Sequence, residues 1–130
     1  MTHSLSRVAA AAALVMASVG TLSPSAMAVT YLAQMDPELV ALSRAKNLAR
    51  QAGERANGGV VQYRAEPAMH GPAEEAPFLA NPDGSWTFTF QGCDRSLIGI
   101  DGQCTRYSVE TVVTVFPSGE ITLNDNRLLP

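Results

Sequence analysis

The stretch DPELVALSRAKNLARQAGERANGG, residues 36–59, decides the fold. Asp36 is a residue type that caps helix N-termini, and Pro37 suits the first helical position. Glu38 places a negative charge at the positive end of the helix dipole. The Asn57-Gly58-Gly59 sequence ends the segment, because asparagine and glycine accept the left-handed conformation found after helices. The stretch therefore predicts one helix of about twenty residues.

Leucine and alanine recur along this helix at spacings of three and four residues, and most charged side chains lie off that line. The apolar positions are Leu39, Leu42, Ala45, Leu48, Ala49, Ala52 and Ala56. Small alanine side chains allow close approach to a flat partner, so we expect this stripe to pack on a β-sheet.

In the second half of the chain, apolar and polar residues alternate, which is the pattern of half-buried strands. In WTFTFQG, residues 86–92, the aromatic side chains share one face and the threonines share the other. Residues 105–115 continue the alternation, with Tyr107, Val109, Val113 and Val115 on one side. We expect Leu39, Leu42, Leu48 and Ala52 of the helix to pack on a face that bears Phe88, Phe90, Val109 and Val113.

Short turns connect these strands. Pro-Asp-Gly at 82–84 precedes the first strand, and Pro-Ser-Gly at 117–119 leads into a strand at 121–123. Short connections make neighbouring strands antiparallel. A further strand is predicted at 60–65, followed by a proline-rich loop at 66–77. The sequence thus predicts an α+β fold, with one N-terminal amphipathic helix packed on an antiparallel β-meander of three to five strands.

Residues 1–28 have the three parts of a secretory signal peptide. Arg7 lies in a short polar start, residues 8–20 form an uncharged apolar run, and Ala26 and Ala28 give an A-x-A cleavage pattern. An uncleaved membrane anchor is the alternative, but hydroxyl residues and a proline interrupt the run before the roughly 20 apolar residues that a span requires. We expect cleavage after Ala28 and export of residues 29–130, a single α+β domain, to the periplasm or the extracellular space.

The charge of the predicted mature chain excludes two classes of partner. Without Arg7, eight of the nine basic residues remain against twelve acidic ones, so the net charge changes from −3 to −4. Nucleic-acid binding needs a basic face, and an acidic chain is also repelled by anionic lipid. We therefore expect no nucleic acid and no membrane contact after signal cleavage, and any partner is expected to be a protein.

Both cysteines lie in QGCDRSLIGIDGQC, residues 91–104. In an exported chain, two cysteines most simply form a disulfide, here Cys93–Cys104. A redox centre is disfavoured because C-x-x-C spacing is absent, and zinc would need ligands that this segment lacks. The loop between the cysteines carries Leu97, Ile98 and Ile100, which either fold back on the core or form a partner-binding loop.

Other candidate sites have weaker support. His70 is the only histidine after residue 28, and Glu66, Glu74 and Glu75 lie near it in sequence. A hydrolase needs a nucleophile, a base and a group that orients the base, and no such set is recognisable. Met69, His70 and Glu66 could bind copper. Oxygen ligands for calcium occur without EF-hand spacing at Asp94, Asp101, Asn124, Asp125 and Asn126. We expect no catalytic residue, cofactor or metal.

Three segments carry a resemblance to known proteins: ANGGVVQYRAEPAMHGP at 56–72, WTFTFQG at 86–92 and VETVVTV at 109–115. They resemble a group of small exported cyanobacterial proteins of unknown activity, over most of the predicted mature chain. The resemblance implies export but no activity. By element order alone, the chain is also similar to cystatin-like folds, although the cystatin inhibitory motif is absent: GGVVQY has similar letters in a different order.

The sequence therefore favours a small exported, non-enzymatic binding or structural domain stabilised by one disulfide. The alternative is a periplasmic or extracellular hydrolase, or a redox or metal accessory protein, that uses His70 and nearby acids. A carboxylate of Glu66, Glu74 or Glu75 within hydrogen-bond reach of His70, in a pocket, would favour this alternative.

Overall fold

A computed structural model describes Gly20 and residues 35–130. The chain divides into two units, Met1–Gln34 and Met35–Pro130, and the fold reported below is that of the second unit. Apart from Gly20, the predicted signal peptide at 1–28 lies outside the described residues. Among the helices that are described, none has the length and apolar character needed to cross a membrane.

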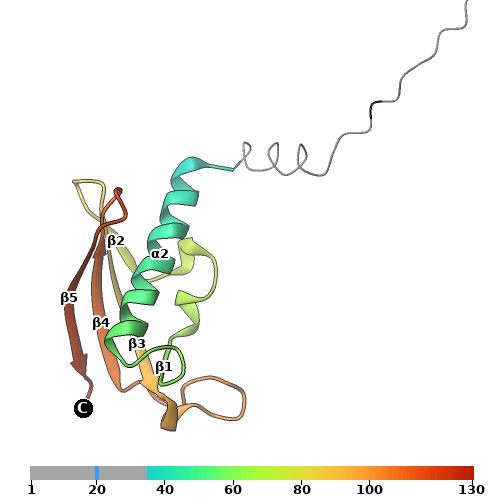
Figure 1. The fold of residues 1–130 in the computed structure, drawn as a ribbon, viewed down its shortest axis with the longest axis vertical. Helices are drawn as coiled ribbons and strands as arrows, with labels where there is room; N and C mark the ends of the chain where they lie inside the picture. Colours follow the sequence, from blue (N-terminus) through green and yellow to red (C-terminus); the bar gives the residue numbers. More distant parts are fainter. Residues whose placement is uncertain (1–19, 21–34) are drawn as a thin grey trace, which may run out of the picture. The chain divides into compact units, whose positions relative to one another are not determined.

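The predicted helix is α2, Pro37–Ala56 (Figure 1). Its N-terminus is capped as expected, because Asp36 Oδ1 accepts a hydrogen bond of 2.9 Å from the Glu38 N–H. At the other end, the backbone N–H groups of Asn57 and Gly59 donate to the carbonyl of Glu54. Gly59 then adopts a φ of 92°, a conformation that favours glycine. Local capping chemistry therefore fixes both ends of the helix.

Five strands form one antiparallel sheet. They are β1 Tyr63–Ala65, β2 Phe78–Ala80, β3 Trp86–Asp94, β4 Val109–Val115 and β5 Ile121–Leu128. The strand order is β1-β3-β4-β5, and β2 also pairs with β3. β1 pairs with the end of β3, at Gly92–Asp94, and β2 pairs with its beginning, at Trp86–Phe88. The predicted α+β class is confirmed, with five strands.

The segment between β1 and β2 separates the two short strands that pair with β3, and it lies against the helix. It contains two 3-10 turns, Pro67–Met69 and Ala73–Glu75, and buries the side chains of Met69 and Ala76. The strand predicted at 60–65 is shorter than expected, because the turn that follows α2 extends to Tyr63, whose N–H donates to Gly59. Residues 60–62 are consequently not in the sheet.

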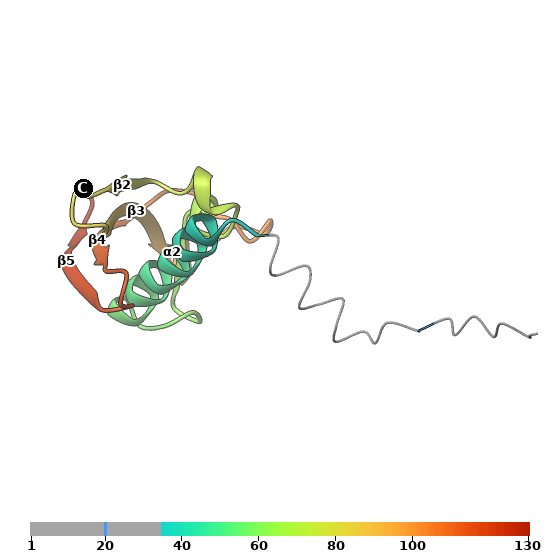
Figure 2. The same cartoon turned by 90° about the horizontal axis from the view of Figure 1, so that it is seen from above.

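The helix packs on the inner side of the sheet, which curves around it (Figure 2). The core cluster joins the small residues of α2 to the inward residues of β3 and β4. Its members on these elements are Leu42, Ala45, Ala49, Ala52, Phe88, Phe90, Val109, Val113 and Val115. The expected contact is confirmed: Leu42 and Ala52 belong to the core cluster, and Leu39 and Leu48 are partly buried and pack against it.

Two glycines allow especially close packing. A Cβ on Gly53 of α2 would lie 2.7 Å from Cζ of Phe90, and a Cβ on Gly92 of β3 would lie 2.2 Å from Oη of Tyr63. Real Cβ atoms do not approach other heavy atoms so closely. The ring of Tyr63 therefore lies across the backbone of β3 in space that only glycine leaves open.

Candidate functional site

The predicted disulfide is present. Cys93 lies in β3 and Cys104 in the following loop, with Cα atoms 5.9 Å apart. The predicted placement of Cys104 at a strand beginning near residue 105 is wrong, because β4 begins at Val109, which pairs with Gly92. Cys104 instead forms an isolated bridge with Ile98. The disulfide thus fastens the small loop hairpin to β3, and does not close the β3–β4 hairpin at its open end.

Hydrogen bonds hold the clipped loop, residues 95–104, in one conformation. Asp94 Oδ1 accepts from the Ser96 N–H at 3.0 Å and starts a 3-10 turn at Arg95–Leu97. The backbone N–H of Thr105 donates to Leu97 O at 2.8 Å, and its hydroxyl donates to the same oxygen at 2.9 Å. A further bond of 2.8 Å runs from the Gly99 N–H to Gln103 O. The loop is therefore constrained at its base and near its tip.

The apolar residues of the clipped loop divide into two groups. Leu97 and Ile98 are half-buried, whereas Ile100 at the tip has a relative exposure of 110%, the value of a side chain with no protein cover. The sequence left two outcomes open, folding back on the core or facing a partner. Neither Leu97 nor Ile98 belongs to the core cluster, and Ile100 is available to a partner.

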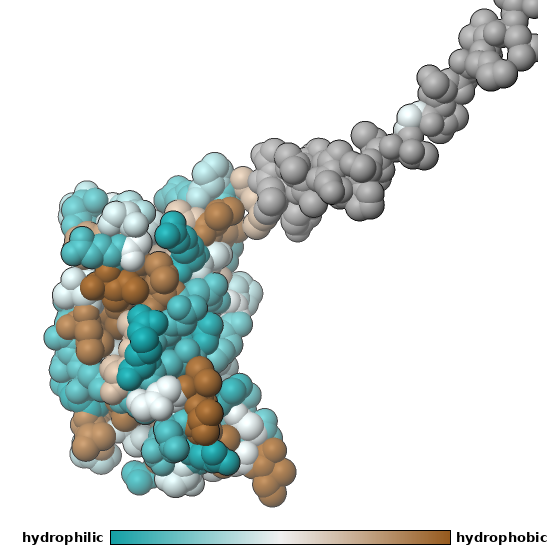
Figure 3. Space-filling view, in the orientation of Figure 1, coloured by the Kyte–Doolittle hydropathy of each residue, from teal (hydrophilic) through white to brown (hydrophobic). Residues whose placement is uncertain are grey.

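Other exposed aliphatic side chains lie at the same end of the molecule. The turn after α2 carries Val60 and Val61, and the Arg95 N–H donates to Gln62 O at 2.8 Å, which joins this turn to the clipped loop. Leu128 at the end of β5 is 82% exposed. We call Val60, Val61, Ile100 and Leu128 the apolar end. The C-terminal end of α2, the loop between β3 and β4 and the C-terminus lie together at the lower end of Figure 1, where Figure 3 shows several separate hydrophobic patches. Sequence reasoning missed Val60 and Val61 because it assigned them to a strand.

A hollow of about 190 Å³ lies beside Leu128. It is lined by Asn57, Gln62, Tyr63, Asp94, Ser108, Val109 and Leu128. Burial raises the pKa of Tyr63 to about 12, and the neighbouring Thr111 hydroxyl offsets only part of this effect. The Tyr63 hydroxyl forms no hydrogen bond of ordinary geometry, and the Thr111 hydroxyl donates to Asn126 Oδ1. This phenol therefore stays protonated at neutral pH and offers no nucleophile.

His70 lacks the surroundings of a catalytic base. Partial burial, and then the charges of Arg50 and Arg64, lower its pKa. Among the described residues, no hydrogen bond joins His70 to a carboxylate; Glu66 instead accepts from the Gln91 N–H at 2.8 Å. A hydrolytic set needs a nucleophile and a base that a third group orients, and the described residues show no carboxylate hydrogen-bonded to the imidazole. The geometry does not favour the hydrolase alternative.

The loop around His70 has a structural attachment. The ammonium of Lys46 on α2 donates to the carbonyl of Gly71, and Arg50 forms an ion pair with Glu54 one turn further along the helix. Lys46 and Glu54 are both buried. Buried charges of this kind are tolerated because each has a partner. The bond from Lys46 to Gly71 attaches this loop to α2.

Several of the side chains suggested as metal ligands are buried or hydrogen-bonded to other parts of the protein. Met69 is fully buried in the core, whereas His70 is exposed, so the two side chains do not share a copper site. Asp94 and Asp101 each accept from a backbone N–H of their own loop, and Asn126 bonds to Asn57 and Thr111. Within the described part of the chain, no group of three or more His, Cys, Asp or Glu side chains could hold a metal ion.

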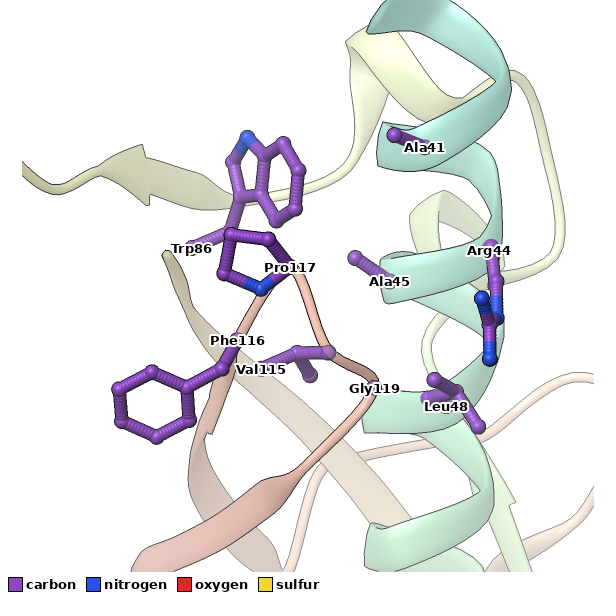
Figure 4. A pocket seen from close by; sticks show the side chains of 9 residues that line it. All are labelled: Ala41, Arg44, Ala45, Leu48, Trp86, Val115, Phe116, Pro117 and Gly119. Atoms are coloured by element: carbon purple, nitrogen blue, oxygen red, sulfur yellow. The ribbon is translucent and has the colours of Figure 1, made fainter. Parts of the chain in front are cut away.

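A second hollow lies between α2 and the β4–β5 turn (Figure 4). Trp86 and Pro117 lie next to each other on the sheet side, and Ala41 and Ala45 face them from the helix. Its volume is about 50 Å³. Sites for small organic ligands usually measure about 300–1,000 Å³, so this hollow is a packing gap beside the helix.

Comparison with known proteins gave no assignment. No family model, no curated protein and no solved structure matches the chain. The function must therefore be argued from the geometry of the described residues.

Proposed function

We propose that this chain is a small exported binding domain without catalytic activity, which presents the apolar end to a protein partner. One observation carries the proposal: Ile100 is fully exposed at the tip of a loop that a disulfide and several hydrogen bonds hold in place. A binding loop that is already ordered loses little conformational entropy on association. The alternative, a hydrolase or accessory protein that uses His70, is less well supported, because no carboxylate among the described residues is hydrogen-bonded to the imidazole.

The exposure of Ile100 is unfavourable in an isolated chain. Burying an isoleucine side chain contributes about 1.5–3 kcal/mol to the free energy of folding. The clipped loop keeps Ile100 exposed, so the fold does not gain this stabilisation. Val60 and Val61 are also exposed, on the turn that the Arg95–Gln62 hydrogen bond joins to this loop. Large exposed apolar surface on a protein domain commonly marks an interaction site. A protein surface with an apolar recess would bury all three side chains.

The charges near the clipped loop indicate the chemistry of the partner. Arg95 and Arg106 are exposed, and neither forms an ion pair within residues 35–130. The nearby acids Asp94 and Asp101 direct their carboxylates to N–H groups of the loop. Arginine is enriched at protein interfaces, where it pairs with carboxylates. We therefore expect an apolar partner surface that is bordered by acidic side chains.

Export is part of the proposal. A structural disulfide is typical of oxidising compartments, and Cys93–Cys104 supports a periplasmic or extracellular location. The signal-peptide pattern at 1–28 and the resemblance to small exported cyanobacterial proteins point in the same direction. Measuring the N-terminal residue of the protein isolated from its native compartment tests this part: cleavage after Ala28 is expected, and recovery of the intact N-terminus would contradict it.

Affinity capture from the native envelope tests the binding surface. We expect the wild-type chain to retain a partner at a fixed stoichiometry, and we expect Ile100→Ser to lose it. Leu79→Ser is the matched control, because Leu79 is also exposed, at 67%, but lies on β2 away from the clipped loop. Capture that is equal for both variants, or no stoichiometric partner for the wild type, would contradict the proposal.

A further inference from the structure

The two edges of the sheet differ in how they are protected from pairing with another strand. On one side, β1 and β2 have three residues each, and Pro67, Pro72 and Pro77 lie in or beside the segment between them. Short strands and prolines are devices that block edge-to-edge pairing. On the other side, β5 has eight residues, contains no proline and follows the outer margin of the sheet (Figure 1).

The hydrogen bonds between β4 and β5 show which backbone groups face outward. The Leu129 N–H donates to Ser108 O at 2.9 Å, and the register then pairs Glu110 with Arg127 and Val112 with Asp125. In an antiparallel ladder, bonded and non-bonded pairs alternate. Asp125 and Arg127 therefore direct their backbone groups to β4, and Asn126 directs its N–H and C=O away from the sheet.

Side-chain contacts hold this part of β5 in position. The amides of Asn126 and Asn57 bond reciprocally, at 3.1 and 3.0 Å, and Thr111 donates to Asn126 Oδ1 at 2.8 Å. These contacts attach β5 to the C-terminal end of α2. The outward backbone groups of Asn126 are thus presented by a fixed strand.

We propose that β5 pairs with β5 of a second copy of this chain, antiparallel and centred on Asn126. In this arrangement, Asn126 of each copy exchanges N–H···O=C bonds with Asn126 of the other. Asp125 and Arg127 then lie opposite Arg127 and Asp125 of the second copy, on the same face of the joined sheet. The two sheets become one sheet of ten strands.

Charge complementarity favours a second copy over another partner. In a non-bonded antiparallel pair, Cα atoms lie about 4.5 Å apart, so each Asp125 carboxylate meets an Arg127 guanidinium. These side chains are 52% and 61% exposed, and their own separation of 4.0 Å is long for a hydrogen bond. Arg127 also pairs with Glu110 on β4. In the dimer, negative and positive side chains therefore alternate across the joined sheet, in the order Glu110, Arg127 and the second copy's Asp125.

The pairing should be weak. A β-bulge between Val112 and Val113 shifts the register near Asn124, which shortens the regular part of the edge. One strand pair buries much less than the roughly 1,600 Å² of a standard interface. We therefore expect a dimer that dissociates on dilution.

Sedimentation analysis of the purified chain over a range of concentrations tests this inference. We expect dimers of the wild type to increase with concentration, and we expect both Arg127→Glu and Asp125→Arg to be monomeric. Each variant places like charges opposite each other when it pairs with itself. An equimolar mixture of the two should restore dimers, because opposite charges then meet at both positions.

Arg106→Glu is the matched control, since it makes the same charge change just after the clipped loop, outside β5, and should leave the dimer intact. Circular dichroism and intact-mass analysis of the disulfide establish that each variant is folded. A monomeric wild type at the highest concentration, dimers unaffected by either single variant, or a mixture that stays monomeric would each overturn the inference. Because only the purified chain is used, these outcomes are independent of the partner proposed for the apolar end.

Discussion

Replacing Gly92 by alanine tests the close packing between β1 and β3. The new Cβ would lie 2.2, 2.3 and 2.5 Å from Oη, Cζ and Cε2 of Tyr63. The ring cannot move aside easily, because Tyr63 is 2% exposed and belongs to the core cluster. Replacing glycine by alanine where the space is open stabilises a protein by about 0.4–1 kcal/mol through the unfolded chain.

The clash should outweigh that gain. Overpacking a core costs about 1–3 kcal/mol, and contact with two ring carbons and the hydroxyl oxygen places this site at the upper end of that range. For a domain of this size, a loss of 1 kcal/mol lowers Tm by roughly 4–8 °C. We therefore expect Gly92→Ala to lower Tm by more than about 8 °C, measured by circular dichroism during heating.

Gly71→Ala is the matched control, because its nearest atoms would lie 3.8 and 3.9 Å away. We expect its effect to stay within about 0.5 kcal/mol. A double-mutant cycle with Tyr63→Ala identifies the cause. The double variant Gly92→Ala, Tyr63→Ala should lose less stability than the sum of the two single variants, because removing the ring relieves the clash. Tyr63→Phe should give no such relief, because Cζ and Cε2 remain. Equal stability of Gly92→Ala and Gly71→Ala would refute the reasoning.

Three further predictions concern stability. The double substitution Cys93→Ser, Cys104→Ser removes the disulfide. It should lower the free energy of unfolding by about 3 kcal/mol, which is the loop-closure value for a separation of 11 residues. An unchanged midpoint in urea titration would contradict this. Leu42→Ala, at a buried position, should lower the free energy of unfolding by about 2–4 kcal/mol, and Leu48→Ala, at a partly buried position, should lower it clearly less. If urea titration gave the reverse order, the helix would be rotated relative to the sheet. Because the folded-state pKa of His70 lies below its ordinary 6.5, the unfolded chain binds more protons in that region, so stability should fall as pH drops below about 6.5. His70→Gln should reduce this slope, and an unchanged pH profile would show that other groups cause it.

The elements that the sequence predicted well depend on local chemistry. The cap at Asp36 and the glycines after Asn57 act within a few residues, so the ends of α2 follow from the sequence. The alternation of residues 86–92 and the turn at 117–119 similarly determine which face of β3 is buried and where β5 begins. Both cysteines lie in one segment, and for this reason their pairing could be predicted.

The parts that sequence reasoning missed depend on contacts between distant segments. Leu42 and Leu48 lie on the same apolar stripe, but Leu42 is buried and Leu48 only partly so, a difference that the spacing does not give. Val60 and Val61 have high strand propensity, but the hydrogen bond from Tyr63 to Gly59 keeps them in a turn. The pairing of β5 with β4 only, which leaves an open edge, is likewise a property of the whole sheet.

The exposed tip of the clipped loop is the basis of the proposed function, and site-specific photo-crosslinking in the native compartment tests it most directly. A photoreactive amino acid placed at Ile100 should give one discrete adduct with a partner protein. The same amino acid at Leu79, an exposed apolar position on β2, should give none. If position 100 yields no protein adduct, or if position 79 yields the same adduct, the apolar end is not the binding surface.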